Sequence, residues 1–141
     1  MENIPYPDPV AARAALDDVA AAQRAVRDTP WPVWLYPVNA LLLGALSLTA
    51  LLGDQRSTAA LAVSLTLVVT NLAAGYRMGT PYAVPTSRAF LTCVAASAAC
   101  LVAALAAAEL TDRTWPVVVL ALGATGSYLV GAVFHRRSTA R

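Results

Sequence analysis

Charged residues are scarce in this sequence, and lysine is absent. Asp, Glu and Arg together make up 13% of the 141 residues, whereas hydrophobic residues make up 58%. An ordinary soluble domain is about 25% charged and about 45–50% apolar. So little charge excludes a disordered chain, a nucleic-acid-binding protein and most soluble globular folds, which leaves a membrane protein. Arginine without lysine, in a chain rich in alanine, is typical of a GC-rich bacterial genome.

Residues that carry chemistry are also few. His135 is the only histidine, and a metal site needs three or four converging ligands. Cys93 and Cys100 lie seven positions apart, about 10 Å along a helix, which is too far for a disulfide. The sequence has neither a plausible nucleophilic triad nor a glycine-rich phosphate loop. We therefore expect no catalytic, cofactor or metal-binding residues and no enzymatic activity.

Four apolar runs dominate the rest of the chain, at residues 33–52, 58–76, 89–108 and 115–134. Each run is close to the twenty or so residues that an α-helix needs to cross about 30 Å of hydrocarbon. None contains the ionisable residues that proton-coupled transporters keep inside the membrane. Short connections make successive helices antiparallel neighbours. We expect an all-α fold in which residues 31–137 form an up-down-up-down transmembrane bundle, followed by a tail at 138–141.

Arginine is distributed unevenly between the two ends of this bundle. One end has only Arg56 and Arg113, and the other carries Arg13, Arg24, Arg27, Arg77, Arg88, Arg136, Arg137 and Arg141. The positive-inside rule therefore predicts that both termini are cytoplasmic in a bacterial cell membrane. Aromatic and basic side chains are expected to anchor the inner interface, namely Trp31, Trp34, His135, Arg136 and Arg137. Partner binding or pH sensing is the less favoured interpretation of His135.

Residues 1–30 are polar and are expected to form a cytoplasmic helical segment that stays attached. Asp8 is a suitable N-cap before Pro9, so the helix is expected to run from about Pro9 to Arg27. Its large apolar residues are Leu16, Val19 and Val26, a stripe too thin for firm binding to a membrane surface. The favoured interpretation is a helix that docks on its own bundle. The alternative is a helix that pairs with a second copy or with another protein.

Small residues recur every four positions in three of the runs, which is typical of helix packing in membranes. We expect these rows to be packing seams rather than the lining of a pore. They are Ala62, Thr66, Thr70 and Ala74; Ala95, Ala99, Ala103 and Ala107; and Gly123, Ser127 and Gly131.

Two amides fall at similar depth in adjacent expected helices. Asn39 lies just inside the start of the first run, and Asn71 lies just before the end of the second. Other polar residues near this level are Thr70, Thr92, Ser127 and Tyr128. Because an amide in hydrocarbon needs a partner, we favour an interhelical hydrogen-bond layer. A ligand pocket open to the cytoplasmic leaflet is the alternative.

The entry TPWPVWLYPVNALLLGAL and the later YRMGT resemble small four-span actinobacterial integral membrane proteins of unknown function. Members have an Ala/Arg-rich N-terminal helix and a P-W-x-Y-x-P-like entry to the first span. The resemblance implies the same four-span layout and no site residues.

Two functions remain open. The favoured hypothesis is a non-enzymatic scaffold, regulatory or accessory subunit whose residues 9–28 contact a membrane-protein or cytoplasmic partner. The alternative is a homo-oligomeric pore or small-molecule carrier, with a path lined by Asn39, Thr70, Asn71, Ser127 and Tyr128. Neither hypothesis involves nucleic acid or a cofactor, and both place the protein in the lipid bilayer.

Overall fold

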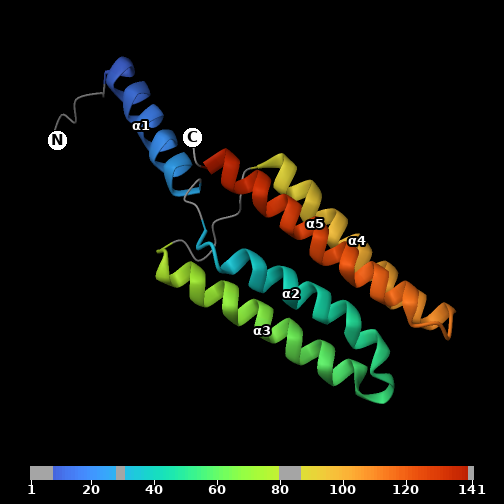
Figure 1. Ribbon diagram of the computed structural model, residues 1–141. Coiled ribbons are helices and arrows are strands. Elements are labelled where there is room, and N and C mark those ends of the chain that lie inside the picture. The colour runs from blue at the N-terminus through green and yellow to red at the C-terminus, as the bar shows by residue number, and fades with distance from the viewer. Residues whose placement is uncertain (1–7, 28–30, 80–86, 140–141) are drawn as a thin grey trace.

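The computed structural model describes residues 8–27, 31–79 and 87–139, and within these ranges it contains helices and no strand. The five α-helices are α1 (Pro9–Arg27), α2 (Leu35–Leu48), α3 (Arg56–Arg77), α4 (Arg88–Leu110) and α5 (Trp115–Thr139) (Figure 1). Two short 3₁₀ helices, η1 (Thr49–Leu51) and η2 (Gly53–Gln55), join α2 to α3. The expected all-α class is confirmed for this part of the chain.

Three helical segments are long and apolar enough to cross a membrane: Gly53–Arg77, Arg88–Leu110 and Trp115–Arg137. The segment expected to form the first span is shorter than the others. Its helix begins at Leu35 after a turn in which the Leu35 amide donates to the Pro32 carbonyl at 2.9 Å. At the other end the backbone turns at Gly53, which has φ +54°. Together α2 and η1 extend about 27 Å, slightly less than the hydrocarbon core of a typical bilayer.

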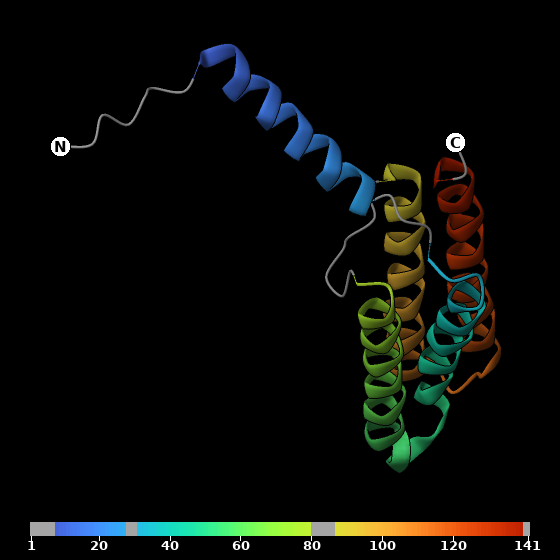
Figure 2. The same ribbon diagram turned by 90° about the vertical axis from the view of Figure 1, so that its left-hand side faces the viewer.

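The helices form two antiparallel pairs, α2 with α3 and α4 with α5 (Figure 1). The closest packing is between α4 and α5, and α2 lies against α5, so α2 and α5 join the two pairs. Figure 2 shows both tight turns at the end of the bundle away from the C-terminus. In contrast, α3 is the least covered of these four helices: its buried residues are Ala74 and Gly75, both in its last turn.

On α4, the seam with α5 follows a seven-residue repeat through Phe90, Cys93, Ser97, Cys100 and Ala104. The residues of α5 that meet them are Gly123, Ala124, Tyr128, Gly131 and His135. Alternating spacings of three and four residues keep such a seam on one side of two gently supercoiled helices. The buried Ser97 hydroxyl also donates to the Ala124 carbonyl across the seam at 2.7 Å.

The predicted rows of small residues coincide only in part with this seam. Gly123 and Gly131 lie at close approaches to α4, whereas Ala95 and Ala99 are exposed within the single chain. Ser127, Ala103 and Ala107 are half-buried; on α3, Ala62 and Thr66 are exposed, Thr70 is half-buried and Ala74 is buried. A strict four-residue row advances about 40° around the helix at each step. It therefore drifts off an interface that a three-four alternation follows.

The N-terminal helix α1 has the predicted bounds and cap. The Asp8 side chain accepts a hydrogen bond from the Val10 amide at 3.1 Å, and the main-chain carbonyl of Asp8 accepts one from the Ala12 amide at 2.9 Å. The expectation that α1 docks on its own bundle is wrong, because α1 projects away from the other helices in both views (Figures 1 and 2). Leu16 is 69% exposed and Val19 is 53% exposed. Neither side chain is covered by the four-helix unit.

The glycines of α5 provide a test of the seam. A Cβ added at Gly131 would lie 2.7 Å from the Cβ of Cys93 and 3.2 Å from a ring carbon of Phe90, whereas one added at Gly126 would meet nothing within 4 Å. We expect Gly131→Ala to destabilise the fold by about 1–3 kcal/mol through overpacking. Gly126→Ala is the matched control and should be neutral or slightly stabilising because alanine favours helix. Thermal unfolding in detergent, followed by circular dichroism, measures both, and equal melting temperatures would contradict this packing.

Candidate functional site

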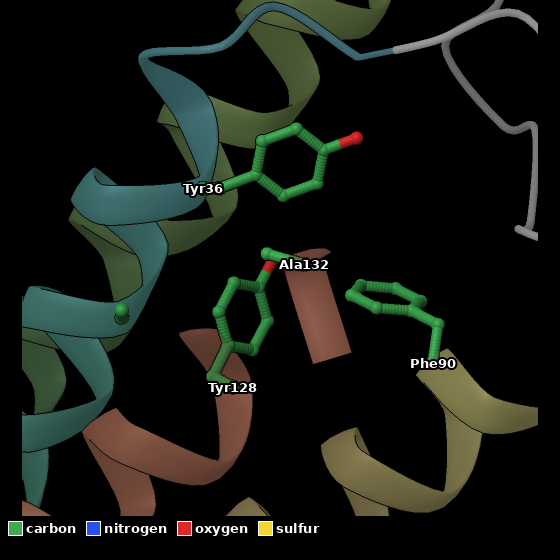
Figure 3. Close-up of a cluster of buried hydrophobic side chains, with 5 residues drawn as sticks. Tyr36, Phe90, Tyr128 and Ala132 are labelled. Atoms are coloured by element: carbon green, nitrogen blue, oxygen red, sulfur yellow. The ribbon is translucent and has the colours of Figure 1, made fainter. Parts of the chain in front are cut away.

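Polar and aromatic side chains gather near the end of the bundle where α2 begins and α5 ends. Figure 3 shows the rings of Tyr36, Phe90 and Tyr128, from α2, α4 and α5, turned toward a common interior. Two groups of contacts meet at Tyr128. One is a hydrogen-bonded cluster of amides, and the other is a cluster of stacked rings.

The amides of Asn39 on α2 and Asn71 on α3 form a reciprocal pair. The Nδ2 atom of Asn39 donates to Oδ1 of Asn71 at 2.9 Å, and Nδ2 of Asn71 donates to Oδ1 of Asn39 at 2.8 Å. Asn39 is buried and Asn71 is half-buried. Two hydrogen bonds in a low-dielectric environment hold the side chains in one relative orientation.

The remaining amide hydrogens of this pair also have acceptors. Asn39 donates a second hydrogen bond to the Tyr128 hydroxyl at 3.1 Å, and Asn71 donates one to the Leu67 carbonyl of its own helix at 2.8 Å. An asparagine amide has two N–H donors, so both donors of both side chains are used. We call Asn39, Asn71 and Tyr128 the amide clasp, which links α2, α3 and α5.

Three other residues expected in this polar layer lie apart from the amide clasp. Thr70 and Ser127 are half-buried, and Thr92 is exposed with its hydroxyl donating to the Ala89 carbonyl at 2.9 Å. In the part of the chain that the structure describes, no hydrogen bond joins these three to the clasp. Adjacent helical positions point about 100° apart. Thr70 and Ser127 therefore share the depth of Asn71 and Tyr128 without facing the same way.

The aromatic cluster is centred on His135, which is 2% exposed. Its ring stacks on Phe90 with a centroid separation of 5.0 Å and meets Trp31 edge-on at 5.8 Å. Tyr36 lies 6.1 Å from His135 and 6.0 Å from Trp31, centroid to centroid. Phe90 then contacts Tyr128 at 5.8 Å, which connects the aromatic cluster to the amide clasp. Rings in these geometries attract one another in addition to burying apolar area.

The expectation that His135 reaches the lipid interface is wrong, because its ring is inside the bundle. It lies seven residues after Tyr128, two helical turns, and therefore on the same face of α5. Trp31 is half-buried in the same cluster. Trp34, Arg136 and Arg137 are exposed, as the predicted role of interface anchors requires.

The sequence interpretation did not find the packing partners of these residues. Phe90 was not singled out, although it contacts Trp31, Tyr128 and His135. The spacing of Tyr128 and His135 was a usable signal, since a heptad separation puts both on one face. No sequence pattern indicates the close approach of α2 to α5 at Gly44, where a Cβ would lie 2.3 Å from the Thr125 hydroxyl oxygen.

The chemistry available at this site is that of hydrogen bonding and ring packing. Within the described ranges, no three His, Cys, Asp or Glu side chains come together to hold a metal ion. Cys93 and Cys100 are free thiols on the seam. The amide and phenol groups of the clasp bond to one another, so the arrangement is suited to holding helices in register.

The amide clasp predicts the effect of removing one partner. Asn71→Leu should destabilise the bundle by about 1–2 kcal/mol, because it leaves the buried Asn39 amide without its reciprocal partner. Thr66→Val is the control on the same helix, since the exposed Thr66 hydroxyl bonds only to the Ala62 carbonyl of its own turn. Thermal unfolding in detergent reports both changes. An Asn71→Leu protein that melts like the control would contradict a stabilising role for the pair.

Because the His135 ring is buried, we expect its removal to destabilise the fold, unlike removal of the exposed arginine side chains next to it. His135→Ala should destabilise the protein by about 2–4 kcal/mol, because it opens a cavity against Phe90, Trp31 and Tyr36. Arg137→Ala, two residues away and exposed, should change stability by less than about 0.5 kcal/mol. Chemical unfolding in a fixed detergent compares the two, and equal small effects would indicate that the His135 ring lies outside the bundle.

Comparisons of the chain with protein-family models, with curated proteins and with solved structures found no match. Its function is therefore inferred from its own residues. The features that bear on it are the bonded amides of Asn39 and Asn71, the buried ring of His135 and the exposed stripe of α1.

Proposed function

We propose that this chain is a non-enzymatic, four-span integral membrane protein that acts as a scaffold, regulatory or accessory subunit through α1. The single observation that carries the proposal is the exposure of α1, a helix of 19 residues that projects from the bundle and leaves Val10, Leu16 and Val19 uncovered. A helix in that state can bind another protein without disturbing the packed spans.

The α2–η1 segment is the first of the four proposed spans. It packs between α3 and α5, both of which are long enough to cross the membrane by themselves. A hydrophobic segment a few ångströms too short is accommodated by local thinning of the bilayer or by flanking side chains that reach the interface. Trp34 at the start of α2 is exposed and suited to that position.

The arginines support an orientation with both termini in the cytoplasm. Arg77, Arg88, Arg136 and Arg137 lie at the end of the bundle that carries the C-terminus, while Arg56 lies at the opposite end. Because the excess of arginine marks the cytoplasmic side, α1 would lie at the inner membrane surface, separated from Trp31 by three residues of the sequence.

The exposed stripe of α1 has the pattern of a helix-pairing surface. Ala12, Leu16 and Val19 follow one another at spacings of four and three residues, so they share one side of the helix. Arg13 and Asp17, four residues apart, flank this stripe, and their opposite charges favour the helix itself. A partner that offers an apolar helical face would cover the stripe and leave these charges in water.

The alternative of a pore or carrier has no comparable support. Its proposed lining includes Asn39, Asn71 and Tyr128, whose polar atoms are engaged with one another in the amide clasp. A permeating polar solute would have to break those hydrogen bonds or pass elsewhere. The amide clasp instead favours a rigid membrane anchor for α1.

Native mass spectrometry on tagged protein extracted gently from its own membranes tests the proposed role. Leu16→Gln with Val19→Gln should remove the mass of a heteromeric complex, because it places polar groups in the pairing surface. Ala14→Gln with Ala21→Gln is the matched control: each position lies about 200° around the helix from Leu16 or Val19, and this variant should keep the complex. A chain that appears only as a monomer or a homo-oligomer, with or without these changes, would contradict the accessory-subunit role.

A further inference from the structure

A cleft of about 470 Å³ opens at the end of the bundle away from the chain termini. It lies between the start of α3, the end of α4 and η1, and its walls include Ala60, Val102 and Ala106. At this end α3 and α4 are separated, because the close packing of α4 is with α5 and that of α3 is with α2. The walls of the cleft are mostly apolar, and two helices able to cross a membrane, α3 and α4, bound it.

Two opposite charges stand at the mouth of this cleft. The Arg56 guanidinium, at the first residue of α3, donates to the Glu109 carboxylate near the end of α4. Their side chains are 51% and 61% exposed, so both remain accessible from the surface. Exposed ion pairs contribute little to stability. The two groups can therefore exchange this contact for contacts with a ligand at small energetic cost.

We propose that this cleft binds one phospholipid with a zwitterionic ethanolamine headgroup. The phosphate accepts hydrogen bonds from Arg56, the primary ammonium donates to Glu109, and one acyl chain lies along Ala60, Val102 and Ala106. The inference rests on the membrane insertion in the proposed function and is independent of the partner of α1.

The dimensions and chemistry of the cleft fit this ligand. From Glu109 to Val102 the helix descends about 10 Å, and from Arg56 to Ala60 about 6 Å, which suits the upper part of an acyl chain below its headgroup. Arginine pairs well with phosphate. Because the Arg56–Glu109 pair is net neutral, it favours a headgroup with both charges over an anionic one. A choline headgroup has no N–H to donate to Glu109.

The test reconstitutes the full chain in vesicles of equal parts phosphatidylethanolamine, phosphatidylcholine and phosphatidylglycerol. The protein is then extracted in a mild non-ionic detergent, and native mass spectrometry counts the lipids that each chain retains. We expect one retained phosphatidylethanolamine per chain in preference to the other two lipids. Retention of the three lipids in equal amounts would overturn the headgroup assignment.

Three variants test the parts of the site. Ala106→Phe fills the cleft and should abolish the retained lipid, whereas Ala96→Phe is the control, an exposed alanine on the same helix outside the cleft and about 15 Å away. Glu109→Gln should lower the preference for ethanolamine over choline about tenfold, since a charge-assisted hydrogen bond is lost. Arg56→Gln should weaken retention of all three phospholipids.

Two further outcomes overturn the proposal. Equal lipid retention in Ala106→Phe and Ala96→Phe would place the lipid elsewhere, and a dimer mass that Ala106→Phe removes would identify a second copy as the occupant. A chain that fails to associate with the vesicles at all would contradict the proposed membrane insertion instead. That failure is visible before any lipid is counted, so the two hypotheses fail separately.

Discussion

The reciprocal hydrogen bonds between Asn39 and Asn71 hold α3 against α2, and α3 has little other buried surface to specify its position. Inside a membrane, helix faces covered with Leu, Val and Ala gain little by exchanging lipid for one another. The buried residues of α3, the least covered helix, are Ala74 and Gly75 in its last turn. The amide clasp lies one turn before these residues and joins α3 to α2 and, through Tyr128, to α5. Register at this end therefore depends on directional bonds.

Close packing of small residues, rather than hydrogen bonding between amides, holds α4 against α5, and this packing supports the amide clasp. Cysteine, serine, alanine and glycine along the seam let the two backbones approach closely, as at Gly131 against Cys93. Close approach increases dispersion contacts, and these remain favourable where the hydrophobic effect between helices is weak. The aromatic cluster around His135 closes the same end of the seam. Tyr128 bonds to Asn39 in the amide clasp and contacts Phe90 in the aromatic cluster. The position of α5 therefore determines the contacts of both clusters.

This division of the molecule into a packed unit and an exposed helix bears on function. Within the four helices from α2 to α5, the side chains of Asn39, Asn71 and Tyr128 bond to one another. By contrast, α1 leaves Leu16 and Val19 uncovered. At the opposite end, the separation of α3 from α4 leaves the cleft below Arg56 and Glu109. Both exposed features follow from one constraint. The described helices pack as α2/α3, α2/α5 and α4/α5, and within the described ranges these contacts leave the apolar side chains of α1 and the cleft uncovered.

Local sequence signals were sufficient for the class and for most of the helices. Uncharged runs of about twenty residues indicate membrane-length helices because hydrocarbon excludes charge, and Asp8 with Pro9 marks the start of α1 because it satisfies a free amide there. The equal depth of Asn39 and Asn71 could be derived by counting residues along antiparallel helices. Which face each residue presents was decided only by the tertiary structure, as the burial of His135 and the exposure of Ala95 and Ala99 demonstrate. The physical reason is that depth depends on position along one helix, whereas facing depends on how two helices rotate and cross, and that is determined by all their contacts at once.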